Sequence, residues 1–287
     1  MNANKHLSID FSVIIAVGPN ESPAHLDDCL MSLENQTHPA SEIILSEDGP
    51  MTSAISQTIE SWRSRLPIIR IERRQKVGVA TAWNEAIQIS EKPWIARMDS
   101  DDIAMPDRFE KQVRFLEANP TIDILGGQID EFLYNPDSIE YRRAVPTEHD
   151  DIVRTLAYSN PFNHMTVMMR RTAHQAVGGY QNRGIPGYID YSTWARMLAS
   201  GATGANLPNV LVKARIGNGL FGRRKGWRFL KTEIRFTIQL YRLEYVGFFK
   251  ALALGGSRSL LRLLPEKVMK VLYQFFRRVW AAKVGER

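Results

Sequence analysis

Two aspartates separated by one residue, Asp99 and Asp101, closely follow the apolar run at residues 94–96. In an extended chain, residues i and i+2 lie on the same side, so these carboxylates would converge while their neighbours face away. Paired carboxylate oxygens suit Mg²⁺ or Mn²⁺, which proteins commonly share with a substrate phosphate. The pattern predicts a metal–diphosphate site at the carboxyl end of a strand. The alternative is an acidic loop that caps a helix beginning near Pro106.

The bulk composition is that of a soluble globular protein. The chain has 287 residues, 44% hydrophobic and 24% charged, which fits one large domain or one domain with an appendage. The single cysteine, Cys29, excludes an internal disulfide framework and is expected to be a small buried apolar residue. Residues 11–17 lack the flanks of a secretory signal, and no run of about 18 apolar residues predicts a membrane span.

The charge is divided unevenly along the chain. Residues 223–287 contain 16 Lys and Arg against 4 Asp and Glu, whereas residues 1–222 contain 21 basic and 27 acidic residues. A basic tail on an acidic globule predicts an anionic partner, either a membrane surface or a nucleic acid.

Strand and helix patterns alternate over the first 120 residues. This alternation predicts an α/β fold with a doubly wound, mainly parallel sheet, in which ligands bind at the carboxyl ends of the strands. Asp48 and Asp99 would then share one edge. Predicted strands cover residues 11–17, 42–47, 68–71, 93–98, 122–127 and 210–213, and predicted helices begin at Ser22-Pro23 or cover 55–62, 79–89, 108–119 and 191–200.

Several common nucleotide and hydrolase motifs are missing from the sequence. No Gly-x-Gly-x-x-Gly follows the first predicted strand, which argues against a dinucleotide dehydrogenase. No P-loop, no Gly-x-Ser-x-Gly nucleophile elbow and no Cys/His cluster with zinc-ligand spacing occurs.

Five motifs in a fixed order resemble the family 2 bacterial glycosyltransferases, which have the type-A nucleotide-sugar fold. The resemblance covers residues 11–224 and is strongest to the branch that builds exopolysaccharide and O-antigen units on a lipid carrier. It implies a glycosyltransferase domain at 1–222, with a nucleotide-binding half at about 1–127 and an acceptor half at about 128–222, followed by a basic helical tail at 223–287. The motifs are Ser46-Glu47-Asp48-Gly49, the Val77–Ala86 segment, Arg97–Asp102, Asn160–Thr166 and Asp190-Tyr191-x-x-Trp194-x-Arg196.

The resemblance implies a UDP-sugar donor and a divalent cofactor, Mn²⁺ or Mg²⁺. Asp48 would contact the uracil or ribose, although it is also an ordinary turn residue before Gly-Pro. Asp99 would bind ribose or metal, and Asp101 would be the principal metal ligand. Further donor-binding candidates are Lys76, which replaces a common Asn, Gly78, Asn84 and Ser100. The Gly78–Asn84 stretch is equally compatible with a small-residue helix that packs closely on the sheet.

Asp190 corresponds to the residue that serves as general base in the family. It would take the proton of the acceptor hydroxyl, and a single inverting displacement would give a β-linkage from an α-linked donor. The alternative is a helix N-cap. Ile189 stands where the family often has Glu, which could alter acceptor contacts.

Three further residues are candidates for acceptor or diphosphate contacts. His164 could touch acceptor or metal, but a structural histidine fits the pattern equally well. Arg223 and Arg224 could hold the diphosphate, or they could simply begin the basic tail.

The tail predicts amphipathic helices on an anionic bilayer, the alternative being a basic helical pair packed on the globule. Its apolar positions, interleaved with Arg and Lys, are Leu260, Leu261, Leu263, Leu264, Val268, Val271, Leu272, Phe275, Phe276 and Trp280.

Together these features predict an inverting transferase that moves a hexose or N-acetylhexosamine to a glycan on undecaprenyl diphosphate. It would be peripheral at the cytoplasmic face of the bacterial inner membrane and would bind no nucleic acid. The rivals are a sugar nucleotidyltransferase, for which the triphosphate loop is missing, and a non-catalytic membrane-binding or nucleic-acid-binding protein, which leaves the aspartates unexplained.

Overall fold

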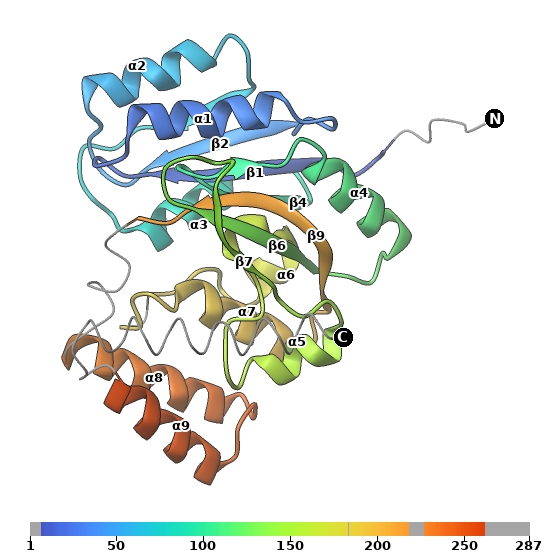
Figure 1. The fold of residues 1–287 in the computed structure, drawn as a ribbon, viewed down its shortest axis with the longest axis vertical. Helices are drawn as coiled ribbons and strands as arrows, with labels where there is room; N and C mark the ends of the chain where they lie inside the picture. The colour runs from blue at the N-terminus through green and yellow to red at the C-terminus, as the bar shows by residue number, and fades with distance from the viewer. Residues whose placement is uncertain (1–6, 183, 218–226, 262–287) are drawn as a thin grey trace.

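The computed structural model describes residues 7–182, 184–217 and 227–261, in which a central sheet has helices on both sides (Figure 1). The strands are β1 (Phe11–Val17), β2 (Glu42–Glu47), β3 (Ile68–Ile71), β4 (Trp94–Asp99), β5 (Ile103–Ala104), β6 (Ile124–Phe132), β7 (Ile139–Arg143), β8 (Met168–Arg170) and β9 (Gly204–Arg215). The helices are α1 (Pro23–Glu34), α2 (Ser53–Trp62), α3 (Val79–Ile89), α4 (Arg108–Ala118), α5 (His149–Thr155), α6 (Arg171–Ala176), α7 (Ile189–Ala199), α8 (Trp227–Arg242) and α9 (Phe248–Leu261), with a 3₁₀ turn at His164–Thr166.

The sheet begins as the predicted parallel, doubly wound unit and continues as a mixed sheet. Its order is β3-β2-β1-β4-β8-β6-β9-β5, with β7 paired to β6. The first four strands are parallel to one another, whereas β8 runs antiparallel to both β4 and β6. The strand order reverses at β1, which has β2 on one side and β4 on the other. In open α/β sheets, ligands bind beside such a reversal, at the carboxyl ends of the strands.

Each face of the sheet carries its own apolar core, because side chains alternate along the strands. On β1, Val13 and Ile15 belong to the cluster under α1, α2 and α4, whereas Ile14 belongs to the cluster under α3, α5, α7 and α8. Cys29 lies in the first cluster, fully buried, where burial and the nearby carboxylates raise the pKa of its thiol. The prediction of a small buried apolar role for Cys29 is therefore confirmed.

Two strands are longer than predicted. The strand expected at 122–127 is β6 and extends to Phe132, and the strand expected at 210–213 is β9 and begins at Gly204. Pro208 interrupts the β9 pattern, and the β6–β9 register shifts beside it, between Gly127 and Gln128. A proline has no N–H to donate to a neighbouring strand. In the sequence, a bulged strand that contains a proline therefore looks like a loop followed by a short strand.

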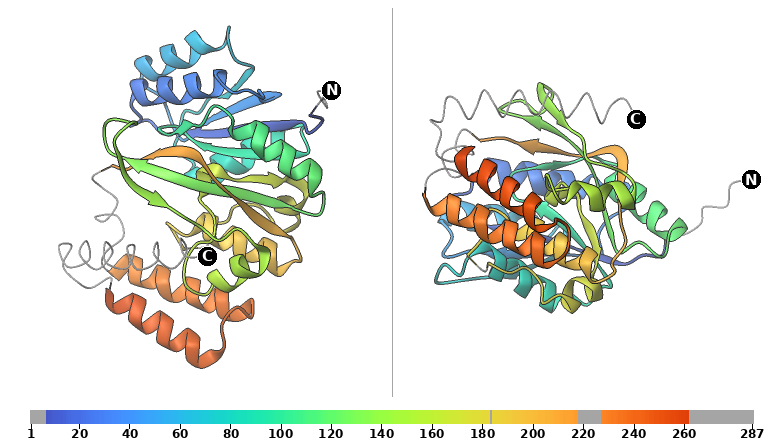
Figure 2. Two further views of the ribbon diagram at one scale, coloured as in Figure 1. Left: turned by 45° about the vertical axis from the view of Figure 1, so that its right-hand side comes forward. Right: turned by 90° about the horizontal axis from the view of Figure 1, so that it is seen from below.

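The last two described helices lie at the end of the molecule opposite α1 and α2 (Figures 1 and 2). Helix α8 packs against α7 and α9, with Phe236 and Leu240 in the second core cluster. Most of the tail residues predicted to contact a bilayer, together with Arg223 and Arg224, lie outside the described residues. Among the described residues, no helix is both long and apolar enough to cross a membrane.

Close packing between β6 and β9 gives a test of this fold. A Cβ at Gly126 would lie 2.3 Å from Asn206 Oδ1 and 3.1 Å from Phe162 Cδ1. Gly126→Ala should therefore lower the free energy of unfolding by about 1–3 kcal/mol through overpacking. Gly256→Ala, where a Cβ would meet nothing within 4 Å inside α9, should leave stability unchanged or slightly raised. Chemical denaturation measures both, and equal effects would contradict the described packing.

Candidate active site

The predicted edge site forms where β1 lies between two acid-bearing strands. Asp48 directly follows β2, and its backbone N–H donates to Val17 O at 2.8 Å. Asp99 ends β4 opposite Ala16. One strand separates the two aspartates, so their backbones lie roughly 10 Å apart. A nucleotide placed across the end of β1 could thus contact both.

The acidic segment after β4 is a turn rather than an extended strand end. Strand β4 stops at Asp99, and the Asp102 N–H donates back to Asp99 O at 3.5 Å. Ser100 is buried and donates to the Glu21 carboxylate, and its contact with a donor stays an untested prediction. Asp102 is buried, and its Oδ1 accepts from the Arg215 N–H at 2.8 Å. The turn places four acidic side chains together instead of two.

Negative charge accumulates in this turn. Burial, followed by Asp99 and Glu21, raises the pKa of Asp101 to about 6. Burial, followed by Asp99 and Asp101, raises the pKa of Asp102, whose Oδ2 is buried without a hydrogen-bond partner. Hard carboxylate oxygens are the donors that Mg²⁺ and Mn²⁺ prefer. Among the described residues, no three or more His, Cys, Asp or Glu side chains are arranged so that they could hold a metal ion by themselves.

Arg97 supplies positive charge behind the acidic turn. Its buried guanidinium pairs with Asp99, and Nη1 donates to Ile14 O and Met98 O at 2.7 Å each. The guanidinium carbon also lies 4.6 Å from the ring centroid of Trp83. The sequence reasoning missed this residue, although a charged residue inside the apolar strand Trp-Ile-Ala-Arg-Met was a usable signal.

The contacts of Arg97 continue into the acceptor half. Arg97 Nε donates to His164 Nε2 at 3.1 Å, and this nitrogen lies 3.0 Å from the Tyr180 hydroxyl. Burial and Arg97 lower the pKa of His164, which is therefore neutral at pH 7. These contacts give His164 a structural place in the core; contact with acceptor or metal stays an untested prediction.

Tyr180 lies between the two halves of the site. Burial raises the pKa of its phenol, Arg97 lowers it, and Asp190 and Asp99 both raise it further. The phenol is therefore within electrostatic reach of the acidic turn and of the predicted base. No motif in the sequence pointed to Tyr180.

Asp190 lies in the first turn of α7, where the N-cap position belongs to Tyr188. The alternative N-cap interpretation of Asp190 is therefore wrong. Asn160 Nδ2 donates to Asp190 Oδ2 at 2.7 Å, which fixes the carboxylate relative to the loop before the 3₁₀ turn. The helix N-terminus favours the negative charge of this carboxylate.

Asp48 organises the loop that carries two other donor candidates. Its Oδ1 accepts from the backbone N–H groups of Val77 at 3.2 Å and Gly78 at 2.6 Å. Gly49 and Gly78 both have positive φ, and the Lys76 backbone lies against Gly49. The carboxylate thus holds the loop at residues 76–78 against the end of β2.

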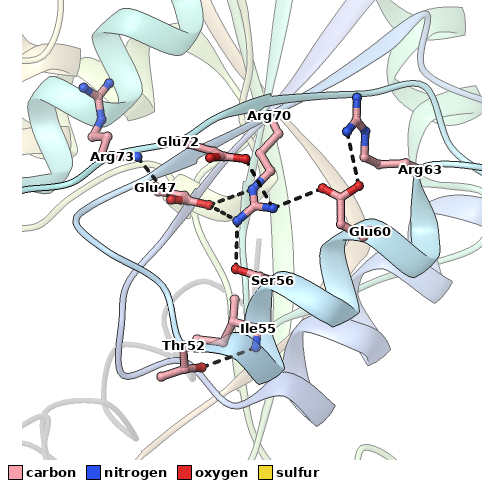
Figure 3. Close-up of polar contacts among 9 residues, drawn as sticks. All are labelled: Glu47, Thr52, Ile55, Ser56, Glu60, Arg63, Arg70, Glu72 and Arg73. Carbon is pink, nitrogen blue, oxygen red and sulfur yellow. Dashed lines mark hydrogen bonds and ion pairs between the residues drawn. The ribbon is translucent and has the colours of Figure 1, made fainter.

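A buried ion pair fixes the strand that leads to Asp48 (Figure 3). Glu47 accepts from Arg70 Nε at 2.8 Å and from the Arg73 N–H at 3.2 Å. Arg70 also donates to Ser56 and Glu60 on α2. These contacts bind β2, β3 and α2 together directly behind the nucleotide edge.

Asn84 has a different set of contacts from the one predicted. Its side-chain amide donates to Tyr180 O at 2.8 Å and accepts from the Tyr180 N–H at 2.9 Å. Both polar atoms are thus engaged with the backbone of the acceptor half. These bonds fix α3 against Tyr180; contact of Asn84 with a donor stays an untested prediction.

The sheet and these groups define a class of protein. Carboxylates gather at the strand-order reversal of an α/β sheet, and Tyr180 packs against Trp194 on α7, the helix that bears Asp190. That arrangement suits the transfer of a group from a nucleotide donor to a second substrate. The family model of glycosyl transferase family 2 matches residues 12–178, and the chain belongs to this family and is a glycosyltransferase.

Relatives that align over nearly their whole length are also named as glycosyltransferases. An uncharacterized glycosyltransferase of Haemophilus influenzae is 40% identical, over 93% of this chain and 99% of its own. The amylovoran biosynthesis glycosyltransferase AmsE of Erwinia amylovora is 35% identical, over 92% and 98%. The UDP-Gal:alpha-D-GlcNAc-diphosphoundecaprenol beta-1,3-galactosyltransferase of Escherichia coli is 31% identical, over 92% and 95%.

Solved structures confirm the type-A fold. Residues 1–349 of S. aureus TarS, in complex with UDP-GlcNAc, match with a TM-score of 0.64 at 18% identity, over 87% of this chain and 72% of theirs. The mannosyltransferase PcManGT of Pyrobaculum calidifontis, in complex with GDP-Man and Mn²⁺, matches with a TM-score of 0.63 at 15% identity, over 97% and 85%.

Two buried arginines beside β4 provide a matched test of the site. Arg108 is as buried as Arg97, but its hydrogen bonds go to Arg97 O, to the Met98 sulfur and to Gln112 rather than to Asp99. Arg97→Met should lower kcat/KM about 10- to 100-fold per folded molecule, because Asp99 loses its orienting partner. Arg97→Lys should recover part of this loss, since it keeps charge without the fork. Arg108→Met should lower stability but keep activity near wild type; equal activity losses in both would contradict the assignment.

His174 makes the stability of the site depend on pH. Burial and then Arg196 lower its pKa to about 4, and its ring lies 4.7 Å from that of Tyr180. Between about pH 6.5 and pH 4 the unfolded chain binds a proton that the folded protein does not. The free energy of unfolding should therefore fall on acidification through this window, by roughly 2–3 kcal/mol from this group. His174→Phe should flatten that slope in denaturation measured across pH, and an unchanged slope would contradict it.

Proposed function

We propose that the protein transfers a hexose or N-acetylhexosamine from a UDP-sugar to a lipid-linked glycan, with inversion at the anomeric carbon. The observation that carries this proposal is the chain of contacts from Asp99 through Arg97 and His164 to Tyr180, whose ring lies 6.2 Å from that of Trp194 on the helix that bears Asp190. A sugar held by its diphosphate at the acidic turn would face the Asp190 carboxylate. The similarity of this chain to an amylovoran biosynthesis glycosyltransferase and to a GlcNAc-diphosphoundecaprenol galactosyltransferase supports the same chemistry.

In this reaction the acceptor hydroxyl oxygen bonds to the anomeric carbon as the bond from that carbon to UDP breaks. The hydroxyl proton goes to the Asp190 carboxylate, which Asn160 orients. A single displacement of an α-linked donor yields a β-linkage. Asp48, Lys76, Gly78 and Ser100 belong to the proposed UDP-sugar site around the end of β1.

The acidic turn fits a divalent cation, Mn²⁺ or Mg²⁺. Asp101, with Asp99 beside it, would hold the ion, which stabilises negative charge on the departing diphosphate. Repulsion among these carboxylates, visible in the raised pKa of Asp101, would be relieved by the bound cation. The solved Mn²⁺ complex of a protein with this fold supports the choice of metal.

The acceptor is proposed to be a glycan on undecaprenyl diphosphate, which places the enzyme peripherally on the cytoplasmic face of the bacterial inner membrane. One relative, 31% identical, is named for a diphosphoundecaprenol acceptor and a UDP-Gal donor. The basic segment at residues 223–287, including Arg223 and Arg224, would favour an anionic membrane or a diphosphate.

Nucleotide binding and catalysis can be separated by two variants. In a thermal-shift panel of UDP, ADP, GDP and CDP with and without Mn²⁺, UDP with Mn²⁺ should stabilise the wild-type protein most. Asp101→Asn should lose the Mn²⁺-dependent part and at least about a hundredfold in transfer rate. Asp190→Asn should keep the thermal shift but lose about 10²- to 10⁴-fold in rate.

The control variant is Asp137→Asn, because Asp137 is exposed and its carboxylate pairs with Lys213. This control should change neither quantity. Stabilisation by every nucleotide alike, or transfer that survives in Asp190→Asn, would count against the proposal.

A further inference from the structure

One side of α8 combines apolar and basic residues that are exposed in the part of the chain that the structure describes. Its buried side contains Phe236 and Leu240, which face the core. At 3.6 residues per turn, the exposed residues fall within about 120° of the helix circumference. They are Lys231, Ile234, Arg235, Ile238, Tyr241 and Arg242.

The exposed strip continues onto α9 without a break. Tyr241 contacts Phe248 with 6.2 Å between ring centroids, and Phe248 contacts Phe249 at 5.5 Å. The side chains of Phe248, Phe249 and Leu252 are 61%, 83% and 68% exposed, more than any apolar residue of α8. Isolated exposed apolar residues need no explanation, but a contiguous apolar strip marks an interaction surface.

The charge around the strip is positive. Of the two acidic residues between 227 and 261, Glu233 is fully buried and accepts from the Tyr188 hydroxyl, and Glu244 lies in the turn between the helices. Lys231, Arg235 and Arg242 flank the apolar residues on α8. Lys250 on α9 lies outside the strip, with its Nζ 4.4 Å from the Tyr158 ring centroid.

We infer that this α8–α9 face, defined by Lys231, Ile234, Arg235, Ile238, Tyr241, Arg242, Phe248, Phe249 and Leu252, docks on an anionic phospholipid surface. Aromatic side chains favour the bilayer interface, and arginine and lysine bind anionic headgroups while their stems cover apolar surface. A protein partner would be expected to offer acidic side chains to these cations. A second copy of this same face would instead present the three like charges of Lys231, Arg235 and Arg242, which opposes self-association through it.

This surface lies within the basic tail at residues 223–287 but uses other residues than the apolar positions at 260–280 that the sequence analysis assigned to a bilayer. Helix α8 packs on α7, which carries Asp190 in its first turn. Docking through α8 and α9 would therefore hold the acceptor half next to the bilayer. The purpose of such docking rests on the proposed lipid-linked acceptor, but the docking itself can be measured without it.

The test is flotation of the full-length protein with vesicles of phosphatidylethanolamine and phosphatidylglycerol, compared with phosphatidylcholine vesicles. Wild type should float with the anionic vesicles, and less so at high salt. Phe248→Ser/Phe249→Ser/Leu252→Ser should lower vesicle affinity about tenfold or more, because three exposed apolar side chains are lost. Lys231→Glu/Arg242→Glu should remove the preference for anionic vesicles.

Tyr134→Ser, at a residue 80% exposed just beyond β6, is the matched control and should float as wild type does. Unaltered flotation of the triple variant would overturn the inference and would assign membrane binding to another segment. A wild-type dimer that the triple variant converts to a monomer would also overturn it, by showing that the face binds a second copy. UDP-dependent thermal shifts, measured in parallel, should be unchanged in every variant, so a failure here leaves the proposed reaction untouched.

Discussion

The buried guanidinium of Arg97 is the interaction on which the rest of the site depends. It pairs with Asp99, donates hydrogen bonds to the backbone carbonyls of Ile14 in β1 and Met98 in β4, and contacts His164. A charge this deeply buried is stable only when every donor is engaged, so the guanidinium specifies where its partners must lie. Those partners come from the acidic turn, from the parallel sheet and from the acceptor half. One side chain therefore fixes the relative position of three segments that are distant in sequence.

The acidic turn has the opposite problem, since negative charge exceeds the positive charge beside it. Arg97 compensates Asp99, and Arg215 supports the turn by donating to Asp101 O and to the Asp102 carboxylate. Asp101 keeps a raised pKa because it remains among carboxylates in a poorly solvated place. Such a group favours binding of a cation more than a fully paired aspartate would. This region of strand ends and short turns thus carries excess negative charge, which a bound cation would neutralise.

The sequence predicted the first half of the fold well because its signals are local. Strands such as Phe11–Val17 and helices such as Val79–Ile89 have the right period and end at turn residues. The acceptor half was predicted less well, since β9 contains Pro208 and β6 contains buried polar residues, whose partners come from distant strands. The same limit applies to the site. Asp48, Asp99, Asp101 and Asp190 follow motifs, whereas Glu21, Arg97, Tyr180 and Arg215 acquire their places only through tertiary contacts.

Asn84 and His164 show that the place of a residue in a family motif does not by itself assign its role. Both belong to segments that resemble the family, yet the Asn84 amide binds the backbone of Tyr180 and His164 lies between Arg97 and the Tyr180 hydroxyl. Each residue meets Tyr180, which neither motif contains. The two segments therefore support one buried contact point between the donor and acceptor halves. Packing in the core around Tyr180 therefore fixes how α3 and the 3₁₀ turn lie relative to each other.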